Sequence, residues 1–308
     1  MLSARAERVR QALGARGLTP ASAASEPSRG RADDAVIAPA ELIEDPVLRS
    51  HAVGRAEPWP GVVAFLDGTR HSEIVGYAGA SPIVVGEVAA AVRERVDRVL
   101  RTAASERRPV AIGREAALTA AGDALAGLDL IATSDDEAPH PVRDLHAAAR
   151  ALERARVALE VAVGAGYRER SDAWLLVDGS LSENPRWAGD ARTVGIARSH
   201  ATLPFDGEEL ERYLRLPAGE RSSVYAPRSR RVAPVRAWAL RLWPWQGKDL
   251  FHGLIRVEVA PVNGTAEMAD RLSRWLLAER APLSTPDPRW DRLLYGIHSV
   301  EACLKAGA

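Results

Sequence analysis

Two hydrophobic segments of the sequence end in the same way, and this feature constrains the fold more than any other. Residues 62–69 read Val-Val-Ala-Phe-Leu-Asp-Gly-Thr, and residues 173–180 read Ala-Trp-Leu-Leu-Val-Asp-Gly-Ser. Each pattern predicts a short strand that is buried on both faces and closed by a glycine turn, with Asp67 or Asp178 at its end. Because burial of a carboxylate is costly, the repeated arrangement favours two side chains that converge on a shared cation.

The composition is typical of an ordinary globular protein. The 308 residues are 46% hydrophobic, and Lys+Arg and Asp+Glu both total 41, so contact with nucleic acid would require a local basic surface. Cys303 is the single cysteine, which excludes an internal disulfide and a thiolate zinc site. The sequence shows no signal core and no run of about eighteen apolar residues, so we expect a cytoplasmic protein that does not enter a membrane.

The composition also divides the chain into an arm and a folded domain. Residues 2–16 have helical spacing, and a stretch rich in Ser, Ala, Pro and Gly follows to about residue 34. Residues 1–58 are therefore predicted to be an N-terminal helix on a flexible arm, and residues 59–308 one folded domain. Within that domain, the Ala- and Arg-rich segment 88–139 is predicted to be a helical insertion or cap.

The order of the remaining elements indicates an α/β fold. Three strands are expected first, then a long amphipathic helix from His140 to about Val163 that ends at Gly164-Ala165-Gly166, and then the second Asp-bearing strand. Further strands and helices are expected at residues 193–198, 207–216, 232–242, 254–259, 263–279 and 290–305. This order predicts a ribonuclease-H-like mixed sheet flanked by helices, in which Asp67 and Asp178 are neighbours at one sheet end.

A length argument selects a third acidic group on the long helix. The strand from residue 173 to Asp178 rises roughly 17 Å, which corresponds to roughly eleven residues of an antiparallel helix. Eleven residues before Gly164 lies Glu153. Glu160 lies on nearly the same face, but it fits only if the helix continues through both glycines. The alternative is that both glutamates solvate the helix beside its arginines.

These features together resemble the NurA family of nucleases over about residues 60–305. The resemblance is carried by Asp67-Gly68-Thr69, a Glu-bearing helix, Asp178-Gly179-Ser180-Leu181, Val-Gly-Ile-Ala-Arg-Ser at residues 194–199 and His298 in a C-terminal helix. It implies a ribonuclease-H-like, metal-dependent deoxyribonuclease that processes DNA ends as an exonuclease or endonuclease. It also implies a homodimer and a partner of the HerA type, which is a hexameric helicase-translocase. A lone histidine on an apolar helix face is otherwise more often a core residue than a ligand.

The resemblance places metal-binding carboxylates at Asp67, Glu153 and Asp178, and a fourth catalytic or metal-contacting group at His298. Carboxylates with one imidazole and no thiolate suit Mn²⁺ or Mg²⁺ better than zinc. In a two-metal hydrolysis of a phosphodiester, Asp67 would bridge the ions and Asp178 and Glu153 would complete their shells. His298 would contact the second ion or help to protonate the leaving group.

Two other functions remain open at this stage. Actin-like ATPases and sugar kinases use an Asp-Gly-Thr turn to cradle the phosphates of ATP, although the glycine-rich adenosine-binding segment that they also need is not evident here. A non-catalytic adaptor of a motor ATPase is the other alternative. The interleaved arginines and tryptophans of residues 236–245 are typical either of a surface that stacks bases or of a packed edge.

Overall fold

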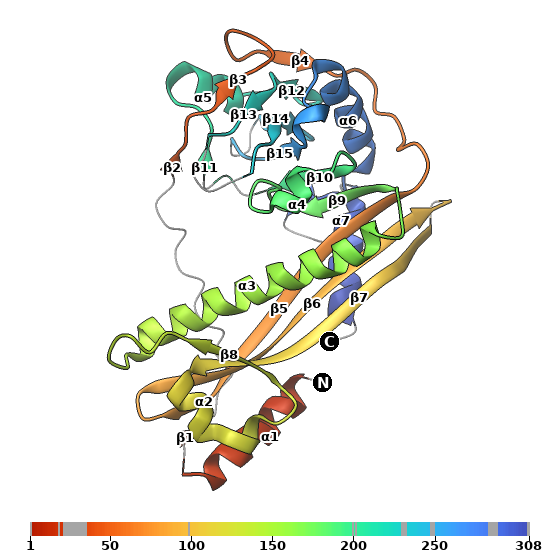
Figure 1. Cartoon of the computed structure of the whole chain (residues 1–308). Helices are drawn as coiled ribbons and strands as arrows, with labels where there is room; N and C mark the ends of the chain where they lie inside the picture. Colours follow the sequence, from red (N-terminus) through yellow and green to blue (C-terminus); the bar gives the residue numbers. More distant parts are fainter. Residues whose placement is uncertain are drawn as a thin grey trace.

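A large mixed sheet runs the length of the molecule and organises it (Figure 1). The computed structural model describes residues 2–17, 19–20, 36–97, 99–198, 200, 202–228, 233–246, 250–282 and 289–306. The sheet order is β3-β13-β14-β15-β10-β9-β5-β6-β7-β8. The bounds of its central strands are β5 (Val63–Ala78), β6 (Ser81–Val96), β7 (Val99–Arg114), β9 (Trp174–Asp178) and β10 (Thr193–Ala197).

The central strands confirm the predicted ribonuclease-H-like order. β5, β6 and β7 form an antiparallel meander, whereas β9 pairs in parallel with both β5 and β10. Leu66 of β5 is opposite Val177 of β9, so Asp67 and Asp178 are the next residues on two neighbouring strands. The predicted proximity of the first strand and the strand after the long helix is therefore confirmed.

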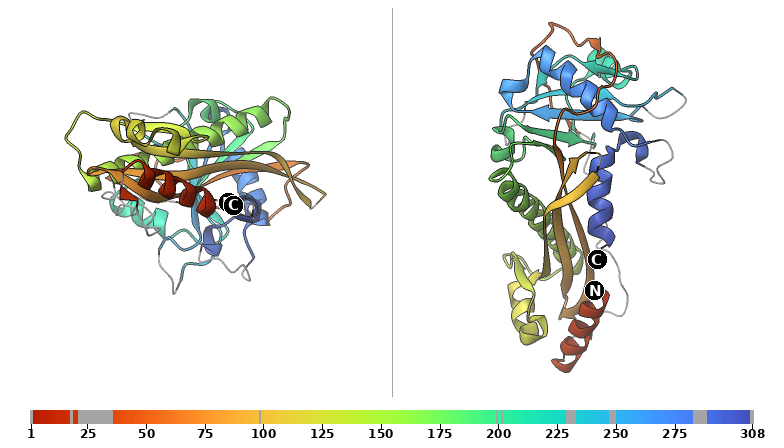
Figure 2. Two further views of the ribbon diagram at one scale, coloured as in Figure 1. Left: turned by 90° about the horizontal axis from the view of Figure 1, so that it is seen from below. Right: turned by 90° about the vertical axis from the view of Figure 1, so that its right-hand side faces the viewer.

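Helices cover both faces of this sheet, as Figure 2 shows. α3 (Pro141–Arg168) packs on one face, and α7 (Tyr295–Ala306) on the other. The start of α3 follows from its local sequence, because the His140 ring accepts from the Arg143 amide at 3.4 Å and proline occupies the first turn. Leu152, Leu159 and the rest of its apolar stripe are buried against Leu66 and its neighbours.

The strands of the meander are much longer than predicted. β5 does not end at Asp67-Gly68 but continues to Ala78, so the strand expected at residues 62–69 is only its first part. The helical insertion expected at residues 88–139 is wrong for most of its length, because β6 runs to Val96 and β7 follows. Only α2 (Glu115–Ala121) and η1 (Gly122–Leu125) are helical before β8 (Asp129–Thr133).

Small side chains explain this error. Ala89 and Ala91 of β6 are buried in the core beneath α7, and Ala90 is buried in the core beneath α3. Alanine favours helices when it is considered alone, but in a strand covered on both faces it lets two helices approach closely. The tertiary context therefore overrides the local propensity.

Short strands and helices complete the fold, and among them residues 36–37 and 202–203 pair with each other in a separate two-stranded sheet. They are α1 (Leu2–Ala15), β1 (Thr19–Pro20), β2 (Val36–Ile37), β3 (Glu41–Leu42), β4 (Ser50–Ala52), α4 (Pro185–Ala188), β11 (Thr202–Leu203), α5 (Gly207–Leu214), β12 (Glu220–Ser222), β13 (Tyr225–Ala226), β14 (Arg236–Arg241), β15 (Leu254–Val259), η2 (Pro261–Asn263), α6 (Ala266–Glu279) and η3 (Trp290–Arg292). None of the helices in the described part of the chain is long and apolar enough to span a membrane.

The N-terminal segment is partly integrated into this fold. The helix predicted at residues 2–16 is present as α1, where Ala6, Val9 and Leu13 are buried against the far ends of β5 and β6. β3 and β4 join the large sheet through β13 and β12. Residues 18 and 21–35, which include most of the predicted flexible arm, lie outside the described residues.

The tryptophan- and arginine-rich segment at residues 236–245 is largely a packed element. Trp238 is fully buried and donates from Nε1 to Ser273 Oγ at 2.9 Å. Arg241 is also fully buried, and it donates to main-chain carbonyls such as that of Leu216. The interpretation of Trp238 as a base-stacking side chain is therefore wrong, and the alternative of a packed element holds for Trp238 and Arg241.

The predicted end of the long helix at Gly164 is also wrong, because α3 continues to Arg168. A Cβ at Gly164 would lie 2.7 Å from Leu66 Cδ2 and 2.9 Å from the Trp187 ring, whereas a Cβ at Gly166 would meet nothing within 4 Å. The first glycine therefore serves close packing between α3, β5 and α4 rather than termination.

This difference predicts opposite effects of one substitution at two nearby glycines. Gly164→Ala should lower the free energy of unfolding by about 1–3 kcal/mol because the core is overpacked. Gly166→Ala should raise it by about 0.5–1 kcal/mol because alanine is the better helix former. Urea denaturation of both variants measures the difference, and equal shifts would contradict the packing explanation.

Candidate active site

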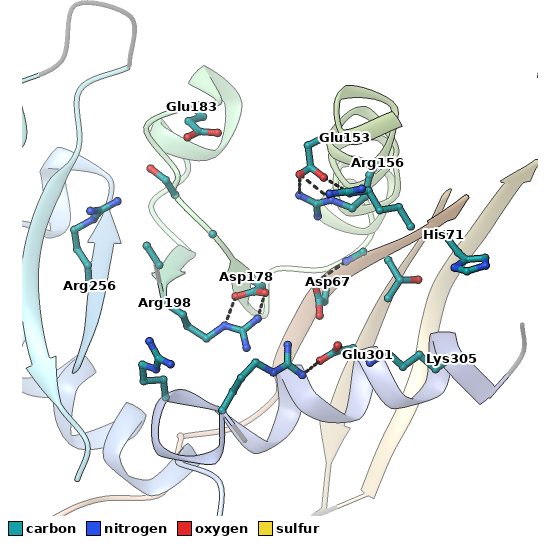
Figure 3. A pocket seen from close by; sticks show the side chains of 18 of the residues that line it. Asp67, His71, Glu153, Arg156, Asp178, Glu183, Arg198, Arg256, Glu301 and Lys305 are labelled. Carbon is teal, nitrogen blue, oxygen red and sulfur yellow. Dashed lines mark hydrogen bonds and ion pairs between the residues drawn. The ribbon is translucent and has the colours of Figure 1, made fainter. Parts of the chain in front are cut away.

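A cleft of about 820 Å³ opens where β9 ends and β5 continues (Figure 3). β9 stops at Asp178, but its neighbour β5 runs on for eleven residues beyond Asp67, so the sheet loses a strand at this point. Residues 67–72 of β5 line the cleft together with side chains of α3 and α7. The two segments that the sequence singled out therefore meet at this opening.

Asp67 and Asp178 face the same opening from adjacent strands. The side chain of Asp67 is only 5% exposed, and the Gly68 amide donates to its Oδ1 at 2.8 Å. Burial raises the pKa of Asp67 well above its usual range, and the negative charges of Asp178 and Glu160 raise it further. Asp178 and Glu160 therefore lie close enough to Asp67 for their charges to destabilise its charged form.

Arg198 is the counter-charge of Asp178. Its Nε donates to Asp178 Oδ1 at 2.9 Å, and its Nη2 donates to Oδ2, which makes a bidentate pair. The positive charge of Arg198 also offsets part of the rise in the pKa of Asp67. Arg198 belongs to the Val-Gly-Ile-Ala-Arg-Ser pattern and directly follows β10, so this pattern supplies the cation for Asp178 of the Asp-Gly-Ser-Leu pattern.

Glu160 is the α3 carboxylate whose charge acts on Asp67, although it is not among the residues that line the cleft. It is buried against Gly68, where a Cβ would overlap the Glu160 carboxylate, so only glycine permits the approach. Burial raises the pKa of Glu160 to about 7; the charge of Arg156 lowers it, and those of Asp178 and Glu153 raise it. The earlier preference for Glu153 depended on a helix end at Gly164, which the structure does not have.

Glu153 lies farther out on the wall of the same cleft. Its side chain is 40% exposed and pairs with Arg70 and Arg156. Although partial burial raises the pKa of Glu153, the hydrogen bond and charge of Arg156 lower it below the usual value. Arg156 also pairs with Glu160, so one guanidinium joins both glutamates.

On α7, the residues that reach the cleft are Glu301 and Lys305, whereas His298 is not among its lining residues. His298 lies one turn before Glu301 on this helix. Glu301 accepts from Lys305 Nζ at 2.9 Å and from Arg289 Nη2 at 2.7 Å, and despite partial burial Arg289 lowers its pKa. Sequence reasoning missed Glu301, although its spacing of three from His298 and four from Lys305 was a usable signal.

The residues after Asp178 explain why the Asp-Gly-Ser-Leu pattern occurs together with the Val-Gly-Ile-Ala-Arg-Ser pattern at residues 194–199. Gly179 has a φ of +125°, which strongly favours glycine. Leu181 then turns into the core, and a Cβ at Gly195 would lie 2.7 Å from its Cγ. Gly195 of β10 is therefore required to seat the loop that carries Asp178.

Basic side chains surround the carboxylates. The cationic lining residues are Arg70, Arg156, Arg198, Arg256, Arg289, Arg292 and Lys305. No Trp, Tyr or Phe is present among the described residues that line the cleft. Such a surface suits a polyanion that is held by its phosphates rather than by its bases.

A separate acidic group lies outside this cleft. Glu44, Asp45 and His51 have ligand atoms within 4.8 Å of one another. Glu44 accepts from both terminal nitrogens of the buried Arg221, at 2.7 and 2.9 Å, and Asp45 accepts from Ser223 Oγ at 2.7 Å. The arrangement is an ion-pair network that ties β3 and β4 to β12.

Comparison with known proteins agrees with this architecture. No protein-family model and no curated protein matches the sequence. Among solved structures, the NurA nuclease from Sulfolobus solfataricus is similar, with a TM-score of 0.51 and 10% identity over 81% of this chain and 80% of that one. The chain shares the fold of that nuclease. An endonuclease V from Streptomyces avermitilis matches with a TM-score of 0.33 and 15% identity over 86% of each chain.

The charge of Glu160 predicts a pH-dependent stability. Its pKa in the folded protein, about 7, lies above the ordinary value of 4.5, so the stability that neutral Glu160 contributes is full below pH 4.5, falls as the pH rises and is lost above pH 7. At pH 8 in a chelator, Glu160→Gln should therefore raise the free energy of unfolding, by up to about 3 kcal/mol. The gain should disappear near pH 4.5.

Urea denaturation at both pH values measures this effect. Glu153→Gln is the matched control on the same helix, and it should give no gain at pH 8 because the pKa of Glu153 is lowered. An equal gain for Glu160→Gln at both pH values would show that its charge is not the cause.

Proposed function

We propose that the chain is a metal-dependent nuclease that hydrolyses phosphodiester bonds of DNA in this cleft. The observation that carries the proposal is that Asp67 and Asp178 line one cleft with seven basic side chains at the break in the sheet, while the charge of the buried Glu160 acts on Asp67 from α3. The fold shared with a NurA nuclease supports it. Enzymes keep carboxylates in such mutually unfavourable positions where a cation or a reaction requires them.

The donor set fits a hard divalent cation. Asp67 and Glu160 are buried carboxylates with raised pKa values, so added positive charge would relieve a repulsion that Arg198 and Arg156 offset only in part. Oxygen ligands without thiolates suit Mn²⁺ or Mg²⁺. Bound cations, two in the mechanism expected from the sequence, would stabilise negative charge on the attacking and leaving oxygens.

The roles of the protein side chains follow from their positions. Asp67, whose pKa the charges of Asp178 and Glu160 both raise, would hold the cations together with those two carboxylates. Glu160 takes the role that the sequence gave to Glu153, and Glu153 is assigned to hold Arg70 and Arg156 at the rim. His298 keeps its proposed role as a fourth group beside the cleft.

The basic side chains would orient the substrate. Arg256, Arg289, Arg292 and Lys305 line the cleft beyond the carboxylates, so they are assigned to the phosphates on either side of the scissile bond. Contacts of this kind position a strand without reading its sequence. We therefore propose cleavage that is indifferent to base sequence.

The wider assembly is proposed from the family resemblance. It includes a cytoplasmic homodimer that processes DNA ends as an exonuclease or endonuclease, together with a HerA-type hexameric ATPase. The ATPase or sugar-kinase alternative receives less support, because Asp67, Gly68 and Thr69 lie inside the β5–β6 ladder, opposite Ala91, Ala90 and Ala89. They do not form the turn that would cradle phosphates.

Asp67→Asn should abolish cleavage while preserving the fold. The carboxamide keeps the shape of the side chain but removes its charge, so kcat should fall at least about a hundredfold. End-labelled single- and double-stranded DNA, incubated with Mn²⁺ and with a chelator control, measures the loss. Asp129→Asn, at an exposed position of β8, is the matched control and should cleave normally. Retained activity in Asp67→Asn would remove Asp67 from the mechanism.

Arg292→Gln should weaken DNA binding equally for unrelated sequences. Loss of one phosphate contact should also reduce the slope of log K against log salt by about 1. Arg271→Gln on α6 removes a guanidinium of similar exposure outside the cleft and serves as the control. Fluorescence anisotropy with the catalytically inactive Asp67→Asn protein measures both slopes. A slope that Arg292→Gln leaves unchanged would place the substrate elsewhere.

A further inference from the structure

A buried carboxylate outside the cleft holds the loop that follows Asp178. Glu258 of β15 is 1% exposed. Its Oε2 accepts from Ser180 Oγ at 2.7 Å, from the Leu181 amide at 2.8 Å and from the Ser182 amide at 3.2 Å. One oxygen therefore receives donors from three successive residues of this loop.

The second oxygen of Glu258 connects to the cleft itself. Oε1 accepts from Arg256 Nε at 2.8 Å, and Arg256 is one of the lining cations. A buried carboxylate is tolerated when it is paired and its lone pairs are satisfied, and both conditions hold here. Glu258 is thus bonded to the loop that presents Asp178 on one side and to a cleft arginine on the other.

We propose that Glu258 is a positioning residue for Asp178 and that its hydrogen bonds set the affinity of the cleft for divalent cations. This inference rests on the proposed function, because it takes Asp178 as a ligand. Gly179 gives the backbone unusual freedom directly after Asp178, so the loop needs external restraint to hold the carboxylate in one place. Residues that orient metal ligands typically contribute about 10–100-fold to metal affinity.

The test is titration of the full chain with Mn²⁺ by isothermal calorimetry. Glu258→Gln keeps the size of the side chain but removes its charge and presents an amide group to buried donors, so the Kd for Mn²⁺ should rise about tenfold. Glu279→Gln is the matched control, because Glu279 is also buried and paired with an arginine, Arg95, but lies outside the cleft. It should bind Mn²⁺ like the unaltered protein.

A second variant keeps the test decisive if Glu258→Gln does not fold. Ser180→Ala removes only one donor to Glu258 and should raise the Kd severalfold. A Kd unchanged in Ser180→Ala and in any folded Glu258→Gln would overturn the positioning role. Asp178→Asn separates this outcome from failure of the metal site: if it too binds Mn²⁺ normally, the proposed function fails, and if it alone binds weakly, only the inference about Glu258 fails.

Discussion

Repulsion among buried carboxylates is the constraint on which the rest of this structure depends. Asp67 and Glu160 are buried carboxylates, and the charge of Asp178 beside them raises the pKa of both. Arginines that are themselves partly buried compensate for this cost, Arg198 from the end of β10 and Arg156 from α3. Each surrounding element supplies part of this charge. α3 carries Glu160 and Arg156, the break in the sheet lies at the two Asp residues, and the lining of the cleft adds further basic side chains.

Relations between distant segments were the most predictable part of the fold. The parallel pairing of the two Asp-bearing strands followed from the order of elements, since a right-handed connection through one long helix leaves few alternatives. The lengths of elements were less predictable. Ala89, Ala90 and Ala91 are strand residues only because helices cover both sides of β6, and Gly164 ends no helix because Leu66 and Trp187 need its space. These outcomes depend on packing between elements that are distant in the sequence, and the local sequence does not reveal that packing.

The residues of the candidate site also differ in how far the sequence predicts them. Asp67 and Asp178 could be found because each ends an apolar run that has a recognisable local pattern. Glu160 was considered, but the choice against it depended on a helix boundary, which is the least certain feature of a sequence-based prediction. Glu258 gave no signal at all, because one charged residue in an alternating strand is ordinary until its neighbours on the loop after β9 are known.

The continuity of β5 has a consequence for how a substrate could enter. Asp67 lies in a strand of sixteen residues that is paired with β6 along almost its whole length, so this strand cannot bend locally without breaking hydrogen bonds to β6. The floor of the cleft is therefore a fixed platform. A polymer bound as proposed would contact the long basic side chains on the walls, and their rotamers can adjust to it above this floor.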